Sequence, residues 1–167
     1  MHSNVWSISS AIILFSLLGV SHANADTPCF TLASLKGTFA VTGNYEGGIA
    51  IAYGVRQLDE AGNLIGTFIL NEPVAGSTTG ARTVITGTQR GSVTTLNCNG
   101  TGTFTRVLTS STGAVTTQID DFVITQATEN EGELHATVIR DAQRTPSALT
   151  TPAVLVTREW TRVPSQK

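Results

Sequence analysis

The feature that most constrains this chain is a succession of short segments in which apolar and polar residues alternate, each ended by turn residues. Alternation with a period of two is typical of strands with one buried face, because successive side chains point to opposite sides. The turns Asp59–Asn63 and Glu129–Gly132 supply the Gly and Asn residues that tight hairpins use. The segments expected to form strands are Gly37–Gly43, Ile49–Leu58, Leu64–Leu70, Arg82–Gly87, Gly91–Leu96, Gly102–Thr109, Ala114–Thr125, Glu133–Arg140 and Ala153–Arg162.

These segments predict an all-β fold of eight or nine strands. A single helical turn is expected within Cys29–Leu35, and no helix-patterned segment separates the strands, which argues against parallel βαβ units. All connections except Asn71–Ala81 and Asp141–Pro152 are short enough for hairpins. The pattern therefore favours one antiparallel up-and-down β-barrel of about eight strands, with a β-sandwich as the alternative.

The first 25 residues have the organisation of a signal peptide. Ala11–Val20 is an apolar run too short to span a bilayer, and Ala23–Ala25 offers the small-x-small pattern of a cleavage site. We expect residues 1–25 to be a signal peptide and residues 26–167 to form one β-barrel domain. The mature protein is expected to be secreted or periplasmic.

The charge, aromatic and cysteine content limit the functional classes to which the chain can belong. The net charge of -2 gives no reason to expect a nucleic-acid partner. The eight aromatic residues after residue 25 are too few for the two aromatic girdles of a membrane barrel, so no membrane insertion is expected. Cys29 and Cys98 form an even pair in an exported chain, which predicts one disulfide. Oligomeric state is left open.

Two groups of motifs resemble known exported barrels. The single turn followed by Gly37-Thr38-Phe39 resembles the opening of the lipocalins, with Phe39 where a Trp usually stands and Arg158 or Arg162 as the Arg that caps it. Cys29-x-x-Leu32, Leu58-Asp59-x-x-Gly62-Asn63 and Asn97-Cys98-x-Gly100 resemble small exported bacterial proteins of unknown function with calycin-like or allene-oxide-cyclase-like barrels. The resemblance implies a calycin-like barrel and says little about chemistry.

The alternation also predicts a polar site among core residues. Arg106, Arg158 and Arg140 share faces with apolar neighbours on three strands, and Asp121 does so on a fourth. A guanidinium stays charged, so its burial requires a partner. One interpretation is a lumen that receives a carboxylate or similar anionic group, lined by Phe39, Tyr53, Phe68, Phe104, Arg106, Arg140 and Arg158. In the other, these arginines lie near strand ends and pair with Asp121 or Glu159.

The sequence offers no catalytic constellation, no metal site and no cofactor motif. His135 is the only histidine after residue 25, and it alternates away from the apolar face. Three hypotheses remain. The first is an exported barrel that binds a small apolar or anionic ligand, the second a structural or surface-interaction protein with a plugged barrel, and the third an allene-oxide-cyclase-like cyclase or isomerase, so that whether the chain is an enzyme stays uncertain.

Overall fold

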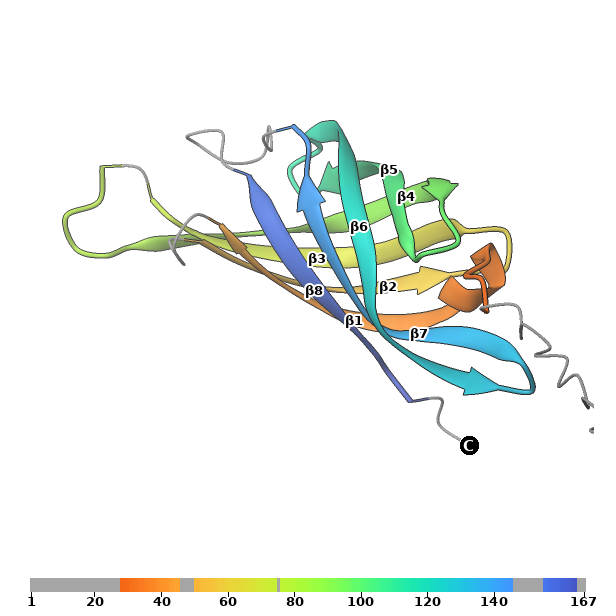
Figure 1. The fold of residues 1–167 in the computed structure, drawn as a ribbon. Helices are drawn as coiled ribbons and strands as arrows, with labels where there is room; N and C mark the ends of the chain where they lie inside the picture. Colours follow the sequence, from red (N-terminus) through yellow and green to blue (C-terminus); the bar gives the residue numbers. More distant parts are fainter. Residues whose placement is uncertain (1–27, 46–49, 75, 146–154, 165–167) are drawn as a thin grey trace, which may run out of the picture.

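A computed structural model describes residues 28–45, 50–74, 76–145 and 155–164 of the 167-residue chain (Figure 1). Eight antiparallel strands, each paired with the next in sequence, close into one barrel when β8 pairs with β1. The up-and-down barrel predicted from the alternation is thus confirmed. The elements are η1 (Leu32–Leu35), β1 (Gly37–Tyr45), β2 (Ala50–Leu58), β3 (Asn63–Pro73), β4 (Arg82–Leu96), β5 (Thr101–Ser110), β6 (Val115–Asn130), β7 (Glu133–Gln143) and β8 (Val156–Arg162).

The prediction of two strands at Arg82–Gly87 and Gly91–Leu96 is wrong, because both belong to β4. The β3–β4 pairing continues without a break from Pro73 and Arg82 to Asn63 and Ser92. Gly87 and Gly91 therefore interrupt the apolar pattern without ending the strand. The expected signal peptide and the residues Ile49 and Ala153 lie outside the described residues.

Glycines make room for bulky inward side chains on neighbouring strands. Each lumen arginine lies opposite a glycine: Arg56 faces Gly66, Arg106 faces Gly91 and Arg158 faces Gly43. A Cβ atom on Gly91 would lie 2.8 Å from the Cβ of Arg106 and 2.7 Å from its Cα. Glycine is needed where another chain segment approaches this closely.

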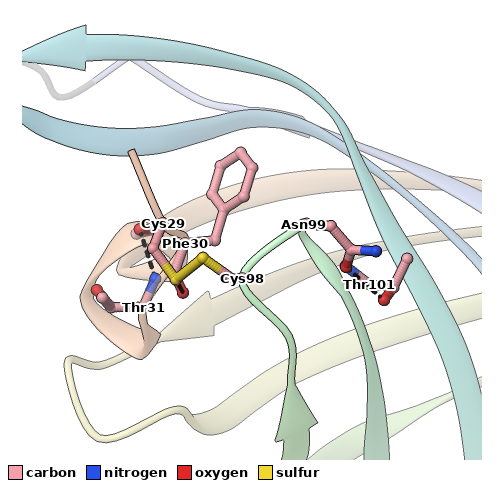
Figure 2. Close-up of a disulfide and its surroundings, with 7 residues drawn as sticks. Cys29, Phe30, Thr31, Cys98, Asn99 and Thr101 are labelled. Atoms are coloured by element: carbon pink, nitrogen blue, oxygen red, sulfur yellow. Dashed lines mark hydrogen bonds between the residues drawn. A yellow bond between two sulfur atoms is a disulfide. The ribbon is translucent and has the colours of Figure 1, made fainter. Parts of the chain in front are cut away.

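One end of the barrel is covered by η1, and we call it the η1 end. Leu35 is fully buried there, and the Cys29–Cys98 disulfide ties the segment before η1 to the β4–β5 turn (Figure 2). The predicted disulfide is confirmed. The bond closes a separation of 69 residues, for which a purely entropic treatment gives about 4 kcal/mol of stabilisation. At the opposite end, β1, β3, β5 and β7 end and β2, β4, β6 and β8 begin, and we call it the loop end.

An aromatic core fills the half of the barrel next to η1. Trp160 stacks on Phe104 with 4.8 Å between ring centroids, and Phe104 contacts Phe122 at 4.2 Å. Phe39 meets Trp160 edge-on at 6.1 Å, and the guanidinium carbon of Arg162 lies 4.9 Å from the centroid of the Phe39 ring. Of the two arginines proposed to cap Phe39, Arg162 therefore occupies that position.

Candidate functional site

A cluster of polar side chains crosses the lumen between the aromatic core and the loop end. Its members project inward from six strands and are all buried, which is unusual because Arg and Asp are almost never fully buried without partners. We call this set the lumen polar cluster; it consists of Arg56, Gln89, Arg106, Gln118, Asp120, Asp141, Gln143 and Arg158.

Asp141 is the acceptor at the aromatic side of the cluster. Its Oδ2 accepts hydrogen bonds from Nη1 of Arg56 at 2.8 Å and from Nε1 of Trp160 at 2.7 Å. Its Oδ1 accepts from Nε of Arg158 at 2.7 Å. The guanidinium of Arg56 also lies over the Trp160 ring, 4.0 Å from its centroid, where a cation–π interaction adds to the ion pair. Asp141 thereby fixes two arginines and the indole in one arrangement.

Asp120 bridges the other two ion pairs. Nε of Arg106 donates to its Oδ2, and Nη2 of Arg158 donates to its Oδ1. Nη2 of Arg106 makes a second contact with Oδ1 at 3.2 Å. Burial raises the pKa of the Asp120 carboxyl, but the guanidinium groups of Arg158 and Arg106 more than offset this and hold it at about 2. Asp120 is therefore ionised at neutral pH.

Three glutamines complete the cluster as uncharged hydrogen-bond partners. Oε1 of Gln89 accepts from Nε of Arg56 at 3.1 Å and from Nη1 of Arg106 at 3.0 Å. Oε1 of Gln118 accepts from Nη2 of Arg106 at 2.7 Å and from Nε2 of Gln143 at 2.6 Å. The glutamine oxygens thus take guanidinium donors without contributing negative charge.

The formal charges of the side chains within the cluster sum to +1. It holds three guanidinium groups and two carboxylates. Burial lowers the pKa of Arg56 to about 9, and the charge of Arg106 acts in the same direction. The pKa of Arg106 is lowered as well, by burial and by Arg158. Both shifts have the same physical origin, the loss of hydration of a buried cation together with repulsion from a neighbouring guanidinium.

A cavity of about 30 Å³ lies beside the cluster. All three lumen arginines and Gln118 line it, together with the apolar side chains of Val41, Phe68, Leu70 and Leu108. A cavity of this size has room for about two water molecules, which is comparable to a single carboxylate group. The arrangement can accommodate a small anionic group with apolar walls around it.

The structure brings together only some of the residues predicted from sequence. Arg106 and Arg158 belong to the cluster, and Phe68 lines the cavity. Phe39 and Phe104 are fully buried in the aromatic core. Tyr53 also borders the cavity, but its side chain is about half exposed. The side chain of Arg140 is exposed, and its guanidinium binds Glu159 at 2.9 Å.

Strand irregularities explain the misplaced Arg140. The β6–β7 pairing shifts register on β7 between Val138, which pairs with Gln126, and Ala136, which pairs with Ala127, and both Ala136 and Ile139 are fully buried. The period of two is thus broken between these positions, so Asp141 points inward and Arg140 outward. On β6 the inward carboxylate is Asp120, whereas Asp121 is exposed and pairs with Arg144.

Arg56, Asp120 and Asp141 were not predicted as site residues. On β2, Arg56 shares a face with Leu58, but the opposite face carries the more apolar Tyr53 and Val55, both of which are exposed. The signal that identifies Arg56 is the opposing Gly66, and this pairing is visible only once the β2–β3 register is known.

The described residues contain no group of three or more His, Cys, Asp and Glu side chains placed to hold a metal ion. Within the same residues, no helix is long and apolar enough to cross a membrane. No protein-family model matches the chain, and no curated protein is significantly similar to it.

Proposed function

We propose that this chain is an exported, calycin-like barrel that binds a small ligand through a single anionic group. The observation that carries the proposal is the sum of +1 over the charges of the lumen polar cluster, beside a cavity lined by its arginines. Burying a net charge is costly, and a bound monoanion would lower that cost. Guanidinium groups pair well with carboxylates, which makes a monocarboxylate the natural ligand class.

The cavity limits which part of the ligand is held. About 30 Å³ accepts a carboxylate group but not a long hydrocarbon chain. Phe68, Leu70 and Leu108 line the cavity with apolar side chains. Any apolar portion of the ligand would extend along these side chains toward the loop end, where Leu70 and Val156 form a second apolar cluster.

Two features support export and the barrel type. The Cys29–Cys98 disulfide is typical of proteins in oxidising compartments. The helical turn before β1, with Arg162 over Phe39, supports the calycin-like assignment. The mass of the exported, oxidised protein tests the first point, because it should equal that of residues 26–167 less two hydrogens.

The ligand proposal is tested by thermal unfolding in a series of sodium carboxylates from formate to octanoate. The controls are the matching amides and sodium chloride at equal ionic strength. A carboxylate at a concentration of about a hundred times its Kd should stabilise the fold by about 2.7 kcal/mol. This free energy corresponds to a rise in Tm on the order of 5–10 °C. No stabilisation by any member of the series would contradict the proposal.

A plugged barrel with a structural role is the second candidate. Every completely buried side-chain nitrogen and oxygen among the described residues already has a hydrogen-bond partner, and the cavity is small. A polar network satisfied in this way can serve to fix one arrangement of the strands. This candidate predicts no response to carboxylates and no extra mass released when the native protein is unfolded in a mass spectrometer.

A further inference from the structure

Two hydrogen-bond donors of the lumen polar cluster are left without an acceptor. Arg56 donates from Nε to Gln89 and from Nη1 to Asp141, which leaves Nη2 unused. Gln118 accepts two hydrogen bonds at Oε1, and within the described part of the chain its Nε2 donates none. Both residues are 1% exposed, so bulk solvent does not supply the missing partners.

These two nitrogens border the cavity. Every completely buried side-chain nitrogen and oxygen of the described residues has a partner, so an unpartnered nitrogen must face open space. For residues as buried as Arg56 and Gln118, that space is the cavity that both of them line. Arg106, in contrast, has all three of its nitrogens engaged with Asp120, Gln89 and Gln118.

We propose that Nη2 of Arg56 and Nε2 of Gln118 are the two donors that hold the carboxylate of the ligand, one for each oxygen. This inference rests on the proposed function and names the contacts within it. A carboxylate accepts hydrogen bonds at both oxygens and carries a single negative charge, which balances the sum of +1 within the cluster. Gln118 then selects for an anion, since its amide presents a donor where a Glu would present an acceptor.

The substitution Gln118→Glu tests this assignment with little disturbance of the fold. The two side chains have nearly the same shape, and the Glu oxygen at the position of Oε1 keeps the hydrogen bonds from Arg106 and Gln143. What changes is the group that replaces Nε2, which becomes an acceptor and brings its own negative charge. The matched control is Gln57→Glu, which adds the same charge at an exposed position of β2.

We expect formate and acetate to raise the Tm of the wild type and of Gln57→Glu equally, and to leave the Tm of Gln118→Glu unchanged. The ligand-free Gln118→Glu protein should melt no lower than the wild type, because its new carboxylate brings the sum of the charges within the cluster to zero. In ¹H–¹⁵N spectra of the wild type, the side-chain NH₂ pair of Gln118, identified by its absence in Gln118→Glu, should shift on titration with acetate.

The outcomes distinguish the assignment of the two donors from the proposed binding of a carboxylate. Equal stabilisation of Gln118→Glu and wild type by acetate would overturn the assignment of the two donors while leaving carboxylate binding in place. Equal stabilisation of the wild type by chloride and acetate would overturn two-point recognition of a carboxylate. The absence of any response in the wild type, with an unshifted Gln118 amide pair, would reject both the assignment and the proposed function.

Discussion

Each lumen arginine is held by at least two cluster side chains from other strands. Arg56 binds Gln89 and Asp141, and Arg158 binds Asp141 and Asp120. Asp141 is central to this arrangement because it accepts from two guanidinium groups and from the indole of Trp160. At this scale, the stability of the barrel depends on keeping two carboxylates among three buried cations.

We predict that Asp141→Asn destabilises the protein by about 3–5 kcal/mol, because it leaves three buried guanidinium groups with one carboxylate. Denaturant-induced unfolding measures the change. The control Asp121→Asn removes an exposed carboxylate that pairs with Arg144, and it should cost less than about 1 kcal/mol. Similar losses for the two variants would show that the buried ion pairs contribute no more than surface ones.

The strands accommodate these side chains through glycines on the strands next to them. The Cβ of an alanine at position 91 of β4 would lie 2.2 Å from the carbonyl oxygen of Thr105 and 2.7 Å from Cα of Arg106. These atoms belong to the backbone of β5 and cannot move away alone. The substitution would therefore disturb the β4–β5 pairing itself.

We predict that Gly91→Ala destabilises the protein by more than about 2 kcal/mol, because overpacking against backbone forces a shift of the strands. Thr88→Ala, at an exposed position of the same strand, should change the free energy of unfolding by about 0.5 kcal/mol or less. Both values come from chemical denaturation followed by circular dichroism. A Gly91→Ala protein as stable as the wild type would refute the packing argument.

The whole molecule places its charges in two different environments. Exposed ion pairs such as Arg140–Glu159 and Arg144–Asp121 lie outside the barrel, whereas the lumen polar cluster lies within it. Surface pairs are screened by water and salt, so their effect on stability is small. The dependence of global stability on pH in acid should therefore include a large contribution from the buried carboxylate of Asp120.

We predict that the protein loses about 2 kcal/mol of stability through Asp120 as the pH falls from about 5 to 2. The folded pKa of about 2 lies below the ordinary value of 3.8, so the stabilisation is complete above the ordinary value and is lost as the carboxyl is protonated. Chemical denaturation at a series of pH values measures this, and Asp121→Asn should keep the same profile. A free energy of unfolding that stays constant over this range would contradict the prediction.

The sequence by itself determined the fold class, the disulfide and, for most strands, which face points into the barrel. Period-two alternation and turn residues specify antiparallel strands locally, because each hairpin forms between neighbours in the chain. A pair of cysteines leaves one disulfide possible. Arg106 and Arg158 could be recognised because each alternates with large apolar residues on its own strand, as Arg106 does with Phe104 and Leu108.

Only the tertiary structure decided which charged side chains form ion pairs with one another. Where both faces of a strand carry apolar residues, the sequence does not show which face is buried. On β2, the apolar residues Tyr53 and Val55 are exposed, whereas Arg56 on the other face is buried. A register shift in the β6–β7 pair reversed the orientation of Arg140 and Asp141. Partners such as Arg56 and Asp141 are 85 residues apart in sequence and come together across the lumen. The lumen polar cluster draws its residues from six strands, and only the closed barrel brings those strands together.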